Sequence, residues 1–487
     1  MGLWTKKSLL DLQQGFEHAD YHLALKRTLG APHLIMLGIG AIIGAGLFSI
    51  TGIAAAENAG PAIVIAFLIA SIGCAFAGLC YSELAAMIPI SGSAYTYAYV
   101  TLGELLAWII GWDLILEYAI GSATVSISWS AYFVSLLHDF NIYLPTAILA
   151  SPWQPVTMPD GSLVYGVINL PAVAIVVAVS FVLMIGIKES ALVNALVVVI
   201  KVAIVVIFIV IGFFYINPAN YTPFIPPNTG VFGEFGWSGI FRAAGVVFFA
   251  YIGFDAVSTA AQETTNPQKA IPIGILGSLL ICTVLYVFFA FVMTGLANYR
   301  ELDVAAPVAV AISKTPFPWL HHLVKLAILA GFTSVILVML LGQSRIFYSM
   351  AKDGFLPKVF SIIHPKFKTP WRSNLILMIF VASFGAFAPL SLVGHMTSIG
   401  TLLAFVIVCA GVLVLRYSQP AHPRPFKTPL VPLVPLLGIL TCLIMMASLG
   451  IDNWLRLFAW LALGMLIYFF YGRKNVKTQD PRVKRKN

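Results

Sequence analysis

The chain has 487 residues, of which 60% are hydrophobic and only 10% are charged, and its mean hydropathy is +0.94. Soluble domains carry about 25% charged residues, so this composition excludes an ordinary water-soluble globular protein. Apolar stretches of about 18 residues or more recur along the chain, and each is long enough to cross a hydrocarbon core of about 30 Å. The sequence therefore predicts an all-α polytopic membrane protein.

Apolar stretches predict about twelve transmembrane helices, which we number in chain order as spans 1 to 12. Their expected ranges are 31–56, 61–87, 103–136, 167–187, 190–216, 239–262, 271–297, 320–350, 373–388, 392–416, 429–449 and 453–472. Span 9 is short, and span 3 is long enough to be strongly tilted. No cleavable signal pattern precedes span 1.

Basic residues predict the orientation of these spans. With both termini in the cytoplasm, the cytoplasmic segments hold 21 of the 28 Lys and Arg residues, including seven after residue 472. The opposite side holds only four, which are Arg300, Lys314, Lys325 and Arg456. Such a bias sets the topology of membrane proteins. The net charge of +9 is then explained by anchoring against anionic lipid, and it requires no nucleic-acid partner.

Two spans are poorly suited to a continuous helix. Span 1 contains GIGAIIGAGLFSI (38–50), and each glycine inside a helix costs roughly 1 kcal/mol relative to alanine. In span 6, Gly253 and Asp255 interrupt the apolar run FFAYIGFDA (248–256). If spans 1–5 and 6–10 form an inverted repeat, the two interruptions occupy equivalent positions, which indicates a secondary transporter's binding site. Either glycine cluster alone is also explained by close helix packing.

Helices broken at mid-membrane would suit a zwitterionic ligand. A break frees backbone N–H and C=O groups, which are tolerated only where protein or a watery cavity satisfies them. The N-terminus of the second half-helix favours a carboxylate, and the freed carbonyls favour an ammonium group. An α-amino acid carries both groups.

Five longer motifs then identify a family. They are GIGAIIGAGLF (38–48), YSELAAMIPISGSAYTY (81–97), GWDLILEY (111–118), FFAYIGFDAVSTAAQETTNPQKAIP (248–272) and GQSRIFYSMAKDGFLP (342–357). In these motifs, and along nearly its whole length, the chain resembles the bacterial members of the cationic amino acid transporter family, within the amino acid–polyamine–organocation superfamily. The resemblance implies an amino acid permease of the bacterial inner membrane that works by alternating access.

The same resemblance implies a LeuT-like fold, in which two five-helix repeats are inverted relative to each other and spans 1 and 6 are unwound at mid-membrane. The expected segments are a cytoplasmic N-terminal segment (1–30), the first repeat (31–216), the second repeat (217–416), two additional helices (417–472) and a basic cytoplasmic tail (473–487).

A main-chain binding site is also implied. In the family, amides of the span 1 break hold the substrate carboxylate, and carbonyls of both breaks face the amine. The matching residues are Gly44, Ala45 and Gly46 for the carboxylate, and Ile42, Ile43, Phe249, Ala250 and Ile252 for the amine. Main-chain contacts recognise the amino-acid backbone and leave the preferred side chain open. Asp255 follows the second break, where it either caps the next half-helix or contacts substrate.

Lys201 lies deep inside span 5, in LVVVIKVAIVV. A lysine within a span is costly and by default functional, and the alternative is snorkelling to the interface. Because desolvation disfavours charged lysine, such a residue can bind and release a proton during transport. In the sodium-independent relatives, a lysine of span 5 occupies the space where other LeuT-like transporters bind sodium, near span 1 and the hydroxyl pair Thr333–Ser334. Proton coupling is therefore favoured over sodium coupling, and no cofactor is expected.

Two residues are candidates for a side-chain pocket. Glu117 in span 3 either contacts a cationic substrate side chain or pairs with Asp113 in a structural cluster. Met339 in span 8 is a pocket wall by resemblance, or else an ordinary core methionine. A methionine there favours apolar or mixed substrates, which departs from the cationic specificity that the family name suggests.

Other function classes have weaker support. The sequence contains no HExxH, GxSxG or CxxC motif and no P-loop, so we expect neither an enzyme nor an ATP-driven pump. All five cysteines lie in apolar runs, which predicts buried thiols and no metal site. An exchanger, a strictly cationic carrier and a transporter-fold sensor stay open as alternatives. The expected partners are an L-amino acid and membrane lipid, while a small membrane-protein subunit or a bound sterol leaves no signature in the sequence.

Overall fold

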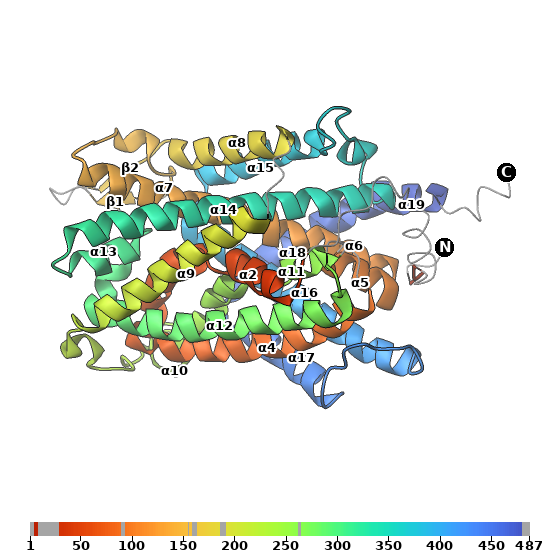
Figure 1. The fold of residues 1–487 in the computed structure, drawn as a ribbon, viewed down its shortest axis with the longest axis horizontal. Helices are drawn as coiled ribbons and strands as arrows, with labels where there is room; N and C mark the ends of the chain where they lie inside the picture. Colours follow the sequence, from red (N-terminus) through yellow and green to blue (C-terminus); the bar gives the residue numbers. More distant parts are fainter. Residues whose placement is uncertain are drawn as a thin grey trace.

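Long helices lying side by side make up the fold (Figure 1). A computed structural model describes residues 4–7, 29–88, 93–153, 155–157, 163–185, 191–261 and 264–479. The helix α19 (Arg473–Gln479) lies at one end of the bundle, and α13 (Pro307–Ser313) lies at the other (Figure 1). Lys7 shares the end of α19, because both contact the chain around Asp353 and Gly354. We call this the terminal end, and the end of α13 the distal end.

The elements follow one another along the chain with short connections. The first part contains α2 (Ala31–Ile42), η1 (Gly46–Ile50), α3 (Thr51–Ala54), η2 (Ala55–Ala59), η3 (Gly60–Ala62), α4 (Ile63–Met87), α5 (Ser93–Thr101), α6 (Glu104–Ile115), η4 (Leu116–Ile120), α7 (Gly121–Asp139), η5 (Thr146–Ile148), α8 (Leu170–Ile185) and α9 (Ala191–Phe213). Between η5 and α8, strands β1 (Pro155–Thr157) and β2 (Leu163–Tyr165) form an antiparallel hairpin that pairs Val156 with Val164.

The second part contains η6 (Pro218–Tyr221), α10 (Gly236–Val247), η7 (Phe248–Tyr251), α11 (Ala256–Thr259), α12 (Pro267–Leu296), η9 (Tyr299–Leu302), α13, α14 (Pro318–Lys352), η10 (Lys358–Ser361), α15 (Trp371–Phe387), α16 (Leu390–Ser418), α17 (Leu433–Ser448), α18 (Ile451–Ile467), η11 (Tyr468–Gly472) and α19. Among the short elements, η1, η2, η4 and η11 are single π-helical turns.

Each range predicted as a transmembrane helix contains helix. Within the described ranges, eight helical stretches are long and apolar enough to cross a membrane. They are Gly46–Met87, Glu104–Asp139, Leu196–Phe213, Gly236–Ser258, Pro267–Leu296, Pro318–Lys352, Leu390–Ser418 and Ile451–Val476. Four shorter apolar helices accompany them, which are α2, α8, α15 and α17. Helix α2 is short because the predicted span 1 stops at Ile42 and resumes at Gly46.

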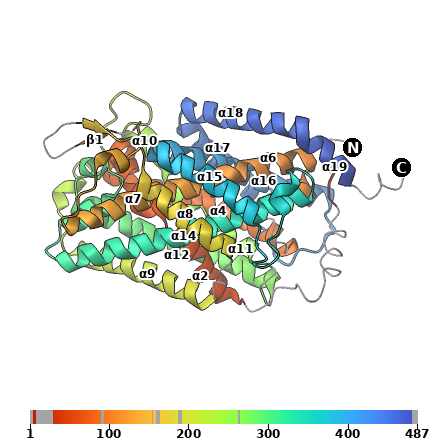
Figure 2. The ribbon, with the colours of Figure 1, turned by 90° about the horizontal axis from the view of Figure 1, so that it is seen from above.

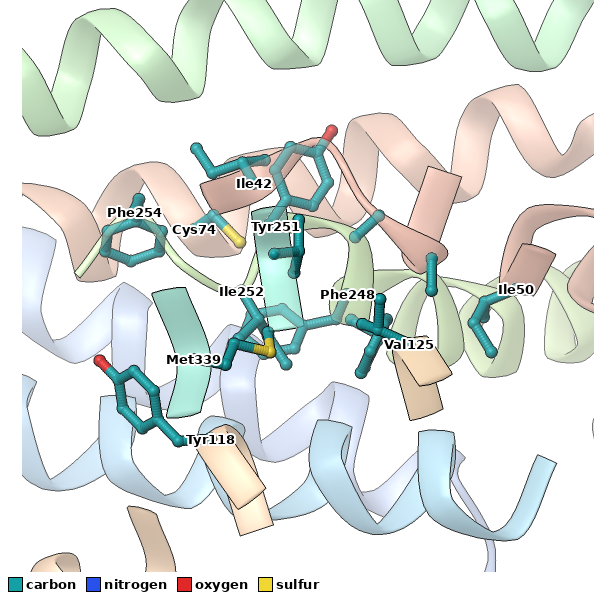
Figure 3. Packing of buried hydrophobic residues seen from close by; sticks show 14 of the residues in the cluster. Ile42, Ile50, Cys74, Tyr118, Val125, Phe248, Tyr251, Ile252, Phe254 and Met339 are labelled. Carbon is teal, nitrogen blue, oxygen red and sulfur yellow. The ribbon is translucent and has the colours of Figure 1, made fainter. Parts of the chain in front are cut away.

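The interior is one continuous apolar core. Helix α12 packs against both α4 and α2, α14 packs along α7, and α16 packs against α17. Figure 3 shows the part of this core where the interrupted helices meet, with Ile42, Tyr251, Ile252 and Met339 close together. The candidate site is therefore built inside the bundle.

The outer surface of the bundle is apolar as well. Helix α18 lies at its edge (Figure 2) and exposes Ile451, Leu455 and Phe458. Helix α9 exposes Leu196 and Val210 in the same way. Large exposed apolar surfaces mark contact with lipid or protein, and this one suits the hydrocarbon region of a membrane.

Candidate functional site

Two helices are interrupted inside the bundle, at the positions predicted from the sequence. Helix α2 ends where Ile43 adopts an extended backbone, with ψ 102°. After η7, Ile252 is extended with ψ 137°, and Gly253 has a left-handed φ of +112°. We call residues 40–46 the first break and residues 249–256 the second break, so that each includes the residues on either side of the interruption.

The two breaks touch each other through glycines. A Cβ atom placed on Gly46 would lie 2.2 Å from Cα of Ala250. A Cβ placed on Gly253 would lie 3.0 Å from backbone atoms of Ala41. The first distance is far below any real contact, so only glycine at position 46 lets the second half of span 1 pack on η7.

Tyr286 of α12 joins the two breaks. Its buried hydroxyl lies 2.9 Å from the carbonyl oxygen of Ile42 and 3.0 Å from that of Ala250. A phenolic hydroxyl has one proton to donate, so it shares that proton between the two carbonyls. Both carbonyls belong to the set predicted for the substrate amine. The sequence analysis missed Tyr286, whose only signal is a polar tip within an apolar run, where a buried tyrosine hydroxyl needs a partner.

Lys201 of α9 lies against the first break and is only 2% exposed. Its ammonium donates to the carbonyl of Gly40 at 2.8 Å, to that of Ile43 at 3.4 Å, and to the hydroxyl of Ser334 at 3.2 Å. The structure thus brings Lys201 together with span 1 and Ser334, as expected. Snorkelling does not describe this side chain, because it points into the bundle.

The side chain of Thr333 points away from Lys201, unlike that of its neighbour Ser334. Its hydroxyl donates to the carbonyl of Leu329 at 2.8 Å and accepts from the indole N–H of Trp129 at 3.1 Å. Adjacent residues on a helix point about 100° apart, so only Ser334 of the predicted hydroxyl pair contacts Lys201.

The remaining residues predicted for the substrate backbone line the same region. The carbonyl of Gly44 accepts from the amide of Phe48 at 3.2 Å, and the carbonyl of Phe249 accepts from the amide of Ile252 at 3.2 Å. Ala45 immediately precedes the turn η1, at its N-cap position. The amides of Gly44, Ala45 and Gly46 therefore stand at the start of the second half-helix.

Asp255 does not cap α11, so the capping interpretation of this residue is wrong. It occupies the N-cap position, but its side chain makes no capping hydrogen bond. Its carboxylate accepts instead from the hydroxyl of Tyr118 at 2.5 Å and from that of Ser93 at 3.3 Å. The carboxylate points toward these two hydroxyls, which belong to neighbouring helices, and not toward the amides of α11. The hydrogen bond from Tyr118 connects the second break to span 3.

A small cavity lies beside the two breaks, since Ala41, Ile252 and Gly253 line it. It has a volume of about 10 Å³, which is roughly the room that one water needs. Its lining residues are Ala41, Glu117, Tyr118, Ile252, Gly253, Ala256, Val335, Val338 and Met339. Three of the predicted binding residues, Glu117, Ile252 and Met339, therefore share one cavity.

Glu117 is one of the residues that line this cavity. It is buried, and its Oε1 atom has no hydrogen-bond partner within the described part of the chain. Neither oxygen of Asp113 has one there either, so the structure does not contain the predicted local pair of Asp113 and Glu117. Ile252 and Met339, which also line the cavity, lie next to each other (Figure 3).

Comparison with known proteins shows to which family the chain belongs. Residues 29–469 match the family described as "Amino acid permease". The chain belongs to this amino acid permease family. A branched-chain amino acid permease of Bacillus subtilis, BcaP, is 43% identical over 98% of both chains. A methylthioribose transporter of the same organism is 43% identical over 93% of this chain and 95% of its own.

More distant permease relatives include the vacuolar cationic amino acid transporter 4 of Arabidopsis thaliana. It is 36% identical over 81% of this chain and 64% of its own length. The predicted membership of the amino acid–polyamine–organocation superfamily is confirmed by these matches. All of these relatives are named as permeases or transporters, so membrane transport is the shared activity of the group.

At the terminal end of the permease, polar side chains hold the N-terminal segment against the bundle. Lys7 pairs with Asp353 at 2.7 Å, and the hydroxyl of Tyr95 donates to the other oxygen of the same carboxylate at 2.7 Å. The amide of Lys7 also donates to the carbonyl of Tyr99 at 3.2 Å. These contacts join residue 7 to α5 and to the end of α14.

Proposed function

We propose that this permease is a secondary active transporter that moves L-α-amino acids across the bacterial inner membrane by alternating access. The observation that carries the proposal is the pair of touching breaks bridged by Tyr286. We further propose twelve spans arranged as two inverted five-helix repeats (31–216 and 217–416), followed by two additional helices (417–472). Both termini would be cytoplasmic, which makes the terminal end the cytoplasmic end.

The substrate backbone would bind at the breaks. The amides of Gly44, Ala45 and Gly46 stand at the positive end of a half-helix, which favours a carboxylate. The carbonyls of Ile42 and Ala250 would receive the ammonium group. Since Tyr286 donates to these carbonyls in the present state, the ammonium would share them with the hydroxyl or displace it.

The cavity favours a neutral, apolar side chain. Ile252, Val335, Val338 and Met339 supply its large aliphatic and thioether walls, and apolar walls discriminate against a charged guanidinium or ammonium. One relative of 43% identity is named as a branched-chain amino acid permease. Branched-chain amino acids are therefore the proposed substrate class, ahead of cationic ones.

A second candidate substrate is methylthioribose. A relative of the same identity is named as its transporter, and the apolar walls of the cavity suit a thioether. Methylthioribose lacks an amino acid's carboxylate and ammonium. A competition panel of the twenty amino acids and methylthioribose against labelled leucine uptake would separate the two. Inhibition by leucine, isoleucine and valine alone supports the first candidate, and stronger inhibition by methylthioribose supports the second.

Lys201 is the proposed coupling residue, together with Ser334. Its ammonium occupies the space beside the carbonyls of Gly40 and Ile43, which are the kind of oxygen ligands that a sodium ion would take. We propose that protonation of this amine replaces sodium binding. Uptake into proteoliposomes across pH and sodium series tests this directly. The expected result is uptake driven by a proton gradient without sodium, and a strict sodium requirement would contradict it.

Exchange and sensing are the alternatives within the same fold. Counterflow in proteoliposomes loaded with unlabelled leucine distinguishes them. A symporter accumulates label with a proton gradient alone, an exchanger requires internal amino acid, and a sensor does neither. Because the relatives are transporters, we propose no enzymatic activity and no cofactor besides the proton.

A further inference from the structure

Tyr132 of α7 contacts three segments that lie far apart in the sequence. It is completely buried. Its hydroxyl donates a short hydrogen bond to the carbonyl of Phe48 in η1. The same oxygen accepts a hydrogen bond from the amide of Val308 in α13, at 3.2 Å. One side chain thus connects α7, the second half of span 1 and the segment between α12 and α14.

Aromatic packing surrounds this hydroxyl. The ring of Phe48 lies 5.7 Å from that of Phe289 and 5.9 Å from that of Phe332. The ring of Tyr132 lies 5.7 Å from that of Phe332. Aromatic pairs at these separations attract beyond their area of contact, and because Tyr132 and Phe48 are buried, the hydrogen bond between them is shielded from water.

Helix α13 closes against α3 just beyond Tyr132. A Cβ atom placed on Gly52 would lie 2.3 Å from Cβ of Pro307. This contact leaves no passage between the second half of span 1 and α13. In this state the distal side of the second half-helix is therefore closed.

We propose that Tyr132 is the positioning residue that holds the distal path closed. Phe48 lies two residues after Gly46 on the same half-helix, so the Tyr132 hydroxyl fixes the segment whose amides would bind the carboxylate. Opening the distal side requires that segment to leave α7 and α13, and both hydrogen bonds must then break. This inference rests on the proposed alternating-access function.

Labelling of a buried cysteine tests the inference. The five native cysteines, all buried, are first replaced by serine or alanine, and Ala311→Cys is introduced on α13, where the native residue is fully buried. A membrane-impermeant methanethiosulfonate reagent is then added from the distal side of the full-length protein in proteoliposomes. Adding Tyr132→Phe should raise the labelling rate about tenfold, the size expected when two buried hydrogen bonds are lost. An unchanged rate would overturn the inference.

Transport kinetics distinguish the proposed role from simple destabilisation, because only the proposed role changes KM in opposite directions on the two sides. A shift toward the distal-open state raises the fraction competent to bind from that side. Tyr132→Phe should therefore lower KM on the distal side and raise it on the terminal side, whereas a merely structural defect lowers the maximal rate on both sides alike. Equal KM changes on the two sides would contradict the proposal.

Two further variants keep the outcome interpretable. Tyr143→Phe is the matched control, because Tyr143 is 71% exposed at the distal end and should change neither measurement. If Tyr132→Phe does not fold, Gly52→Ala pushes Pro307 away and should raise labelling in the same direction. Absence of amino acid transport by the parent protein would refute the proposed function, whereas normal transport with unchanged labelling of the variants would refute only the role of Tyr132.

Discussion

In the first break, the carbonyls of Gly40 and Ile43 accept from Lys201, and the carbonyl of Ile42 accepts from Tyr286. These donors belong to α9 and α12, which lie outside span 1. In the second break, backbone amides supply more of the hydrogen bonds to the carbonyls. The amide of Ile252 donates to Phe249 at 3.2 Å, and that of Ala256 donates to Gly253 at 3.1 Å.

The first break is held by side-chain donors that can change, whereas the second is held mainly by the conformation of its own backbone. Side-chain donors can be lost by deprotonation or rotation, so the first break depends on the charge of Lys201. The turn of the second break depends on the left-handed backbone of Gly253, which does not titrate, and the Asp255 carboxylate in that break is held by the Tyr118 hydroxyl. We therefore expect coupling to act on the first break, while the second provides a fixed surface against which it closes.

Gly46→Ala should have the largest effect, because the breaks meet at this position. The added methyl would overlap the backbone of Ala250, at 2.2 Å from its Cα. Such overpacking costs about 3 kcal/mol, and we expect uptake to fall about 100-fold. Initial uptake rates and thermal unfolding of the purified protein check this. The matched control is Gly30→Ala, where the nearest atom lies 3.8 Å from the new methyl. Equal uptake by both variants would show that the breaks need not touch.

Lys201→Ala should have the next largest effect, because it removes the donor to two carbonyls of the first break. Leaving buried acceptors without a donor costs about 1–3 kcal/mol, so uptake should fall about tenfold at its optimal pH. The remaining uptake should no longer depend on pH. Uptake measured from pH 5 to 9 checks this, with Lys314→Ala as control, since that lysine is 42% exposed. An unchanged pH profile would rule out the coupling role of Lys201.

Tyr286→Phe tests the one side chain that both breaks share. Losing its hydroxyl leaves the carbonyls of Ile42 and Ala250 without this donor, and we expect KM to rise about fivefold with a smaller change in the maximal rate. Concentration series of leucine uptake measure both quantities. Tyr221→Phe is the control, because it removes a comparable hydroxyl-to-carbonyl bond, to Phe291 at 2.8 Å, away from the breaks. A change confined to the maximal rate would place Tyr286 outside substrate binding.

The smallest effects should distinguish two adjacent hydroxyls. Ser334→Ala removes an acceptor 3.2 Å from the Lys201 ammonium, which disfavours the charged form, so the pH midpoint of uptake should move lower by about half a unit. Thr333→Ala removes an acceptor for Trp129 instead, and its pH midpoint should not move. Midpoints from the same pH series decide this. A larger shift for Thr333→Ala would contradict the observed geometry.

Local sequence was enough to predict where the helices are and where two of them break. Apolar runs of sufficient length specify helices in a membrane, and glycines mark the stretches where the helix is interrupted, as at Gly44 and Gly253. The contact of Lys201 with span 1 was also predicted, because a buried lysine must find oxygen acceptors and the resemblance indicated where they lie.

Interactions across long sequence separations were not predictable in the same way. Tyr286 and Tyr132 look like ordinary aromatic residues in apolar runs, and their carbonyl partners lie 244 and 84 residues away. Capping, one of the two interpretations offered for Asp255, uses only the local sequence, whereas its hydroxyl partner Tyr118 lies 137 residues away. The π-helical turn η4 could not be predicted either, because the sequence pattern assumes a regular α-helical period.

Lys201 carries a positive charge on an arm that is covalently part of the protein. A free ion in the same place would be released on the other side of the membrane, and its own concentration gradient would then drive the cycle. A tethered ammonium returns with the protein after every turnover, so only its proton can be delivered. If that proton is not exchanged, the arm acts as a permanent structural cation, and the carrier can only equilibrate its substrate.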